Sequence, residues 1–131
     1  MEPEDVVHVL RNMIEAVDPG GLVLDLQVIR PDPVVESGEE RVCEIWGEPL
    51  FAKADAARAA VDAAIGADQL AEESVDDHDV RKHYPSGADV VDDFADKTRR
   101  IPQGAIPRLL ALKAPVTVRE RCRLRRLRVS G

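Results

Sequence analysis

The chain has 131 residues, of which 44% are hydrophobic and 33% charged, a composition typical of a folded domain and not of a disordered segment. No apolar run approaches the ~20 residues of a membrane span, and the acidic first residues lack the basic and apolar parts of a signal peptide. Two cysteines in unlike segments, Cys43 and Cys122, predict no disulfide framework. We therefore predict a single cytoplasmic domain over residues 1–131.

The net charge of −7 is distributed unevenly along the chain. Residues 115–131 carry six arginines and one glutamate, whereas the preceding part is strongly acidic. A basic tail on an acidic body has two interpretations: an arm that binds nucleic acid, or a segment that pairs with acidic residues of the same chain.

The first predicted element is an amphipathic helix over residues 3–17. Its apolar residues recur at spacings of three and four and form one stripe. They are Val6, Val7, Leu10, Met13, Ile14 and Val17. Pro19-Gly20-Gly21 ends this helix and turns the chain.

Residues 22–29 are almost continuously apolar, which predicts a strand buried on both faces, as in a parallel sheet. Pro31-Asp32-Pro33 is expected to stop this strand, because proline is poorly tolerated in a central strand. The next segments, residues 34–36 and 41–46, read as a β-hairpin that turns at Gly38.

The remaining pattern alternates helices and strands. We predict helices over residues 55–65, 86–97 and 104–113, an extended segment over residues 74–84, and a strand over residues 116–129. Ser86 is the expected N-cap of the second of these helices, with Asp89 completing a capping box. In the last strand, the alternation of apolar and polar residues reverses at Arg125-Arg126. A bulge there would return the apolar side chains to the same face of the strand.

The order helix, Pro19-Gly20-Gly21 and strand 22–29 resembles the C-terminal half of a class I S-adenosylmethionine-dependent methyltransferase. In that family a helix ends in a Pro-Gly-Gly turn and enters the fifth strand of a seven-stranded sheet. The resemblance implies that residues 74–84 and 116–129 are the sixth strand and an antiparallel seventh strand. The expected fold class is α/β or α+β: a partial Rossmann-like sheet with an inserted β-hairpin, flanking helices and a long antiparallel C-terminal strand.

The resemblance implies S-adenosylmethionine as the cofactor, but the cofactor-binding half is missing. The family binds it through a Gly-rich loop after the first strand, and the eight glycines here form no G-x-G pattern. We therefore assign no cofactor-binding residue and expect a half-domain. Its sheet would be completed by a homodimer or by a partner chain, because an apolar strand needs neighbours.

Candidate site residues are few, and no catalytic residue is identified. Ligands of open α/β sheets lie beyond the carboxyl ends of the parallel strands, which makes Gln27, Arg30 and Asp32 the substrate-side candidates. The alternative is a surface ion pair between Arg30 and Asp32. His78 and His83 would lie on opposite faces of a strand, so we predict no metal site.

The arginines of the last strand are expected to pair within the chain. Arg119, Arg121, Arg123 and Arg125 share one predicted face. A nucleic-acid site would favour aromatic residues among them, and this segment contains none. If this strand lies beside residues 74–84, acidic residues come within reach of the arginines. These are Glu72, Glu73, Asp76, Asp77 and Asp79. Nucleic-acid binding is the minority interpretation.

Two functions are compatible with the sequence. The first is methyl transfer, in which this chain supplies the acceptor side of an incomplete or partner-dependent enzyme and positions the nucleophile. The alternative is a non-catalytic interaction or dimerisation module that uses the strand over residues 22–29.

Overall fold

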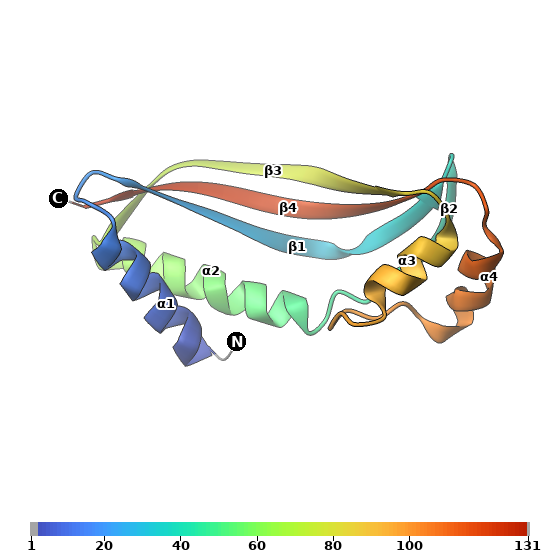
Figure 1. Ribbon diagram of the computed structural model, residues 1–131. Helices are drawn as coiled ribbons and strands as arrows, with labels where there is room; N and C mark the ends of the chain where they lie inside the picture. Colours follow the sequence, from blue (N-terminus) through green and yellow to red (C-terminus); the bar gives the residue numbers. More distant parts are fainter. Residues whose placement is uncertain (1–2, 131) are drawn as a thin grey trace. The chain divides into compact units, whose positions relative to one another are not determined.

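The computed structural model describes residues 3–130, with side chains from Val6 onward. It contains helices and one four-stranded sheet, so the predicted mixed α and β class is confirmed (Figure 1). In chain order the elements are α1 (Pro3–Ala16), β1 (Leu22–Ser37), β2 (Glu40–Glu44), α2 (Leu50–Gly66), β3 (Leu70–Tyr84), α3 (Gly87–Phe94), η1 (Gln103–Ala105), α4 (Ile106–Ala111) and β4 (Val116–Val129). Within the described residues, no helix combines the length and hydropathy that crossing a bilayer requires.

The strand order is β2-β1-β4-β3, with β4 antiparallel to both of its neighbours (Figure 1). At the start of β1, the amide of Gly20 donates to the carbonyl of Val129 (2.8 Å). At the start of β3, the amide of Ser130 donates to the carbonyl of Gln69 (3.0 Å). β1 and β3 therefore run in the same direction but are separated by β4. The prediction of β1 as a strand within a parallel sheet is wrong, because its strand neighbours are antiparallel.

β1 is longer than the sequence predicts, because it continues through Pro31-Asp32-Pro33 to Ser37. β2 pairs with β1 only from Val34 to Ser37. Both prolines precede that pairing, where β1 has β4 as its strand neighbour, and an edge strand tolerates proline. The predicted hairpin at Gly38 is confirmed, but its first arm is the end of β1 and not a separate strand.

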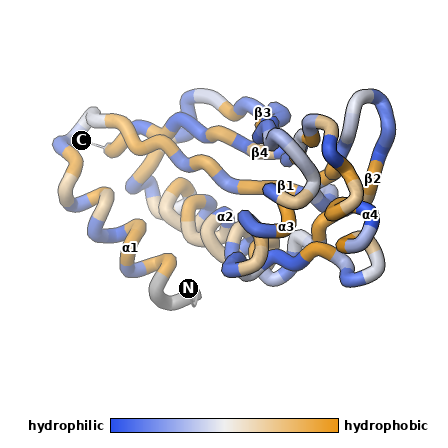
Figure 2. The backbone as a smooth tube through the Cα atoms, turned by 45° about the vertical axis from the view of Figure 1, so that its right-hand side comes forward, coloured by the Kyte–Doolittle hydropathy of each residue, from blue (hydrophilic) through white to orange (hydrophobic). Residues whose placement is uncertain are grey.

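The contacts divide the described chain into two compact units. The first unit contains residues 3–28, 51–78 and 122–130. Its helices α1 and α2 lie on the same side of its strands, and hydrophobic and hydrophilic positions alternate along α1 (Figures 1 and 2). The core of this unit consists of Val23, Val61, Ala64, Leu70, Leu127 and Val129. α2 begins at Leu50, before the predicted residue 55, because its first turns bury Phe51 and Ala54.

The second unit contains residues 29–50 and 79–121. Its core consists of Val35, Val42, Ile45, Tyr84, Val90, Phe94, Ile101, Leu109, Val116 and Val118. The short helix α4 is tied to the hairpin through Arg108, which donates to the carbonyl of Val42 (3.1 Å) and pairs with Glu40. α3 and α4 approach closely at Gly87, whose amide donates to the carbonyl of Leu112 (3.0 Å).

The two helices of the second unit differ in detail from their predicted forms. Ser86 is the N-cap of α3, as predicted, but its hydroxyl donates to the carboxylate of Asp89 (2.8 Å) and makes no backbone capping bond. α3 ends at Phe94, three residues before the predicted end. The predicted helix over residues 104–113 is divided into η1 and α4, because Pro107 lies at the beginning of α4, where proline is favoured.

The burial pattern of β4 changes phase within the strand. Val116, Val118 and Cys122 are buried, and then Arg125, Leu127 and Val129 are buried. The change lies between Cys122 and Arg125, slightly before the predicted flip at Arg125-Arg126. The prediction that Arg125 shares a face with the preceding arginines is wrong, because Arg125 points to the buried side.

The prediction that residues 22–29 are buried on both faces is also wrong. Val23 is in the core, but Leu24 and Leu26 are 60% and 57% exposed. Side chains alternate between the two faces of a strand, so Leu22, Leu24 and Leu26 share the face opposite Val23. Helices α1 and α2 cover only the face on which Val23 lies, which leaves three leucines in contact with solvent.

Candidate functional site

A ladder of ion pairs links the arginines of β4 to acidic residues of the neighbouring strands. In the first unit, Arg123 forms a two-pronged pair with Asp77 (2.8 and 3.0 Å). In the second unit, Arg121 pairs with Asp79 (3.2 Å). The prediction of charge-matched pairing is confirmed at Glu72, Glu73, Asp77 and Asp79. It is wrong at Asp76, whose partner is His78 (3.0 Å).

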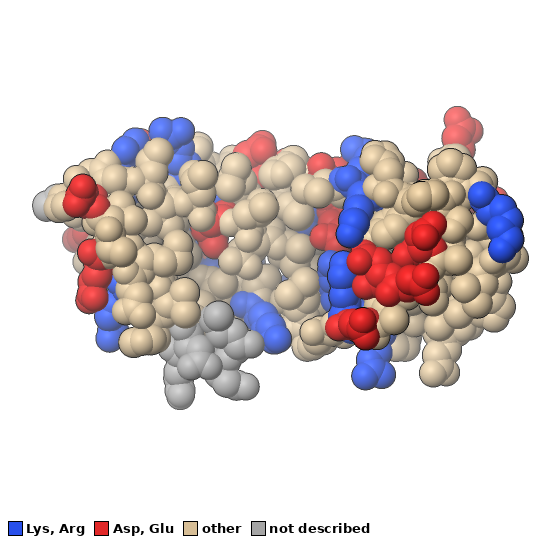
Figure 3. Space-filling view, in the orientation of Figure 1, with Lys and Arg blue, Asp and Glu red and all other residues tan. Residues whose placement is uncertain are grey.

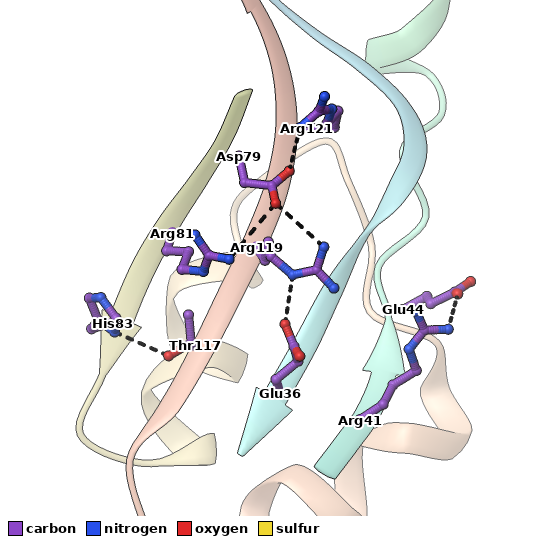
Figure 4. Close-up of polar contacts among 9 residues, drawn as sticks. All are labelled: Glu36, Arg41, Glu44, Asp79, Arg81, His83, Thr117, Arg119 and Arg121. Atoms are coloured by element: carbon purple, nitrogen blue, oxygen red, sulfur yellow. Dashed lines mark hydrogen bonds and ion pairs between the residues drawn. The ribbon is translucent and has the colours of Figure 1, made fainter. Parts of the chain in front are cut away.

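Arg119 shows how the second unit uses these charges (Figure 4). Its Nε donates to Glu36 of β1 (2.8 Å), and its Nη1 lies 3.7 Å from Asp79 of β3. A single guanidinium therefore links β4 to the strand on each side, within the second unit. Glu36 is a partner that the sequence reasoning did not consider.

Arg125 is the most deeply buried charge of the ladder, with a side chain only 7% exposed. Its Nε donates to Glu72 of β3 (2.7 Å), and its Nη2 donates to Asp62 of α2 (2.9 Å). Arg128 pairs with Glu73 (2.8 Å). These contacts pair the arginines of β4 with acidic residues of the same chain, as the intramolecular interpretation predicts.

The three substrate-side candidates make separate contacts, Gln27 in the first unit and Arg30 and Asp32 in the second. Gln27 donates to its neighbour Asp25 (2.9 Å). Arg30 pairs with Glu48 (3.1 Å), and Asp32 accepts a hydrogen bond from the amide of Gly47 (3.0 Å). Arg30 and Asp32 therefore bind the segment between β2 and α2. These structural contacts use the side-chain atoms with which either residue would contact a substrate.

The histidines show no metal-like arrangement. His83 contacts the hydroxyl of Thr117 (3.1 Å; Figure 4). His78 lies 3.0 Å from Asp76. Among the side chains that the structure describes, residues 6–130, no group of three or more His, Cys, Asp or Glu is placed to hold a metal ion. Cys122 is buried and Cys43 is half-buried, and burial raises the pKa of the Cys43 thiol, which makes it less reactive.

The outer edge of β1 over residues 22–28 is the first unit's candidate interface. β4 pairs with its inner edge, and the pairing with β2 begins only at Val34, so no strand among residues 3–130 borders this outer edge. Unpaired backbone groups beside Leu24 and Leu26 offer a pairing edge next to apolar surface.

The second unit contains a polar cluster that the sequence reasoning missed. One oxygen of Asp93, Oδ2, accepts hydrogen bonds from Tyr84 (2.5 Å), Lys82 (3.1 Å) and Lys97 (3.0 Å). Acidic side chains gather over α3, with basic side chains beside them (Figure 3). The sequence carried one signal for this cluster, the i,i+4 spacing of Asp93 and Lys97. The contribution of Tyr84 and Lys82 depends on β3 lying beside α3, which no local pattern specifies.

Two pKa values in this cluster shift in opposite directions. The hydrogen bonds from Tyr84, Lys97 and Lys82 hold the pKa of Asp93 well below its usual range. Burial, together with the hydrogen bond to Asp93, raises the pKa of the Tyr84 phenol. Both shifts favour a charged Asp93 that accepts from a neutral Tyr84.

This cluster predicts a characteristic dependence of stability on pH. The lowered pKa of Asp93 stabilises the fold above pH ~4, and this contribution is lost as the pH falls through the lower folded-state pKa. The raised pKa of Tyr84 stabilises the fold below pH ~10 and is lost as the pH rises. We expect the stability difference between wild type and Asp93→Asn to be largest between these limits. Urea denaturation from pH 2 to 11 measures it, with Asp92→Asn as the control; a difference independent of pH would contradict the prediction.

Comparisons of the chain with protein-family models, with curated proteins and with solved structures find no match.

Proposed function

We propose that this chain forms the acceptor side of a methyltransferase-like domain that depends on a second half for its cofactor. The observation that carries the proposal is the strand arrangement β1-β4-β3 entered through Pro19-Gly20-Gly21. β1 and β3 run in the same direction, and β4 lies antiparallel beside β3. The methyltransferase resemblance implies these directions for the fifth, sixth and seventh strands.

The residues of this chain do not fit S-adenosylmethionine. Its glycines are dispersed, and the Pro19-Gly20-Gly21 turn precedes a strand, whereas a cofactor-cradling loop follows one. The amide of Gly20 is already bonded to Val129, and the amide of Gly21 to Asp18. We therefore derive no catalytic step and place the cofactor site on the second half.

The outer edge of β1 is where that second half would join. A strand added beside residues 22–28 would satisfy the free backbone groups of β1. An apolar element packed against the leucine face would cover Leu24 and Leu26.

A cytoplasmic location is also part of the proposal.

A second candidate function rests on the same edge. A strand edge in an antiparallel sheet can pair with its own copy around a two-fold axis, which gives an isologous dimer. The exposed leucines favour this alternative, in which the chain is a dimerisation module without catalysis.

Calorimetric titration with S-adenosylmethionine and S-adenosylhomocysteine tests the proposal. We expect no saturable heat from the folded chain alone. We expect binding once the chain is co-purified with a Rossmann-like half, for which the product of the neighbouring upstream reading frame is the first choice. Micromolar binding by the chain alone would contradict the half-domain proposal. A stable complex that binds neither compound would favour the dimerisation module.

A further inference from the structure

The outer edge of β1 over residues 22–28 differs in chemistry from the opposite edge of the sheet, which β3 forms. Seven of the 15 residues of β3 are charged, and five of these are acidic. Charged side chains along an edge strand resist pairing with another copy of the same strand. Between Leu22 and Val28 only Asp25 is charged, and Leu24 and Leu26 are exposed. The edge of β1 is therefore the one suited to strand pairing.

The backbone of β1 determines which residues can bond across this edge. The carbonyl of Gly21 accepts a hydrogen bond from the amide of Val129 in β4 (2.9 Å). Backbone groups of successive residues in a strand point to opposite edges, so the odd-numbered residues of this segment point to β4 and the even-numbered residues point outward. The outward-pointing residues are Leu22, Leu24, Leu26 and Val28. Their side chains also share the face opposite Val23.

A second copy can bond to these backbone groups around a two-fold axis perpendicular to the sheet, which places like faces of the two strands on the same side. Leu24 and Leu26 both lie opposite apolar side chains only if the axis is at Leu24, Asp25 or Leu26. An axis at Asp25 would bring two carboxylates directly opposite each other, which is destabilising. An axis at Leu24 would place Asp25 opposite the apolar side chain of Val23 in the copy, which offers the carboxylate no hydrogen bond.

An axis at Leu26 gives compatible pairs on both faces of the strand. On the leucine face, Leu26 lies opposite its own copy and Leu24 opposite Val28. On the other face, Asp25 lies opposite Gln27 of the copy, and symmetry repeats this pair. Within one chain, Gln27 already donates to Asp25 (2.9 Å), and its amide has a second hydrogen to donate. The segment is therefore complementary to itself in this register.

We propose that two copies of this chain join their β1 strands as an antiparallel pair centred on Leu26. This inference rests on the proposed role of the β1 edge as an interface, and it gives the dimerisation module its partner and register. The second copy occupies the edge at which a methyltransferase-like second half would join, so the two assemblies exclude each other.

Disulfide cross-linking tests this register. Opposite residues that exchange backbone hydrogen bonds have Cα atoms ~5.5 Å apart, within the range that a disulfide spans. In Leu24→Cys, the matched control, the two cysteines lie four residues out of register, at ~13 Å. We expect at least about fivefold more covalent dimer from Leu26→Cys than from Leu24→Cys after air oxidation. Both variants also carry Cys43→Ala, because Cys43 is only half-buried, whereas Cys122 is buried.

The charge at residue 27 provides a second measurement of the same register. Gln27→Glu would place a carboxylate opposite Asp25 of the copy in two symmetric pairs, and we expect a dimer dissociation constant about tenfold above that of wild type. Gln27→Lys should dimerise at least as tightly as wild type, because the ammonium attracts Asp25. Sedimentation velocity compares the two variants, which both lose the Gln27 amide and differ in the sign of the charge.

Three results would overturn the proposal. The first is as much covalent dimer from Leu24→Cys as from Leu26→Cys, which would move the axis or show unspecific contact. The second is equal dissociation constants for Gln27→Glu and Gln27→Lys. The third is a wild-type chain that stays monomeric at ~100 µM. None of these measurements involves a cofactor, so a failed titration with S-adenosylmethionine would leave them unchanged.

Discussion

Gly87→Ala is expected to lower the free energy of unfolding by about 3 kcal/mol, the upper range for overpacking in a close-packed interior. A Cβ added to Gly87 would lie 1.9 Å from the carbonyl oxygen of Leu109 and 2.7 Å from its carbonyl carbon. Both are backbone atoms of α4, so no side chain can rotate away. α3 and α4 must separate, and Val90 and Leu109 lose part of their burial.

Urea denaturation measures this effect, and Gly104→Ala provides the matched control. A Cβ at Gly104 meets no heavy atom within 4 Å, so the change should stay within about 0.5 kcal/mol of wild type. Equal midpoints for the two variants would show that α3 and α4 do not approach at Gly87 as described.

Arg125→Ala is expected to lower the free energy of unfolding by about 2–4 kcal/mol. The substitution removes a buried guanidinium and both of its charged hydrogen bonds, to Glu72 and Asp62. The range extends to its lower value because both carboxylates are partly exposed. Water can therefore solvate them once the guanidinium is removed. Arg125→Lys should recover only part of the loss, since an ammonium cannot bridge both acids in the same geometry.

Arg123→Ala is the control for burial. Arg123 makes two contacts with Asp77, but its side chain is 32% exposed, so we expect a loss of about 0.2–1 kcal/mol. Denaturation of both variants in the same buffer compares them directly. A larger loss for Arg123→Ala than for Arg125→Ala would contradict the described facing of β4.

Local patterns predicted the elements whose signals are complete within a short segment. The apolar stripe and the Pro19-Gly20-Gly21 turn predicted α1 and the start of β1, and alternation on either side of the phase change predicted the bounds of β4. The charge asymmetry also predicted four acids of β3 that pair with the arginines of β4, but it missed Glu36 and Asp62. These inferences needed only spacing and charge.

The errors share one physical cause, which is tertiary context. Whether residues 22–29 are covered on both faces depends on elements far along the chain, so hydropathy alone overestimated their burial. Pro31 and Pro33 are predicted to end β1, but both precede its pairing with β2, where β1 is an edge strand that tolerates proline. Tyr84 and Asp93 meet only because α3 packs beside β3, and no spacing in the sequence encodes that contact.

Sedimentation velocity of the purified chain tests most directly whether the outer edge of β1 is an interface. With no other protein present, a second copy is the available partner, and we predict a reversible dimer at about 100 µM. Leu24→Lys with Leu26→Lys should sediment as a monomer, whereas Val75→Lys, on an exposed position of β3, should remain dimeric. A wild-type chain that stays monomeric at this concentration, or a dimer unaffected by the two lysines, would contradict the account.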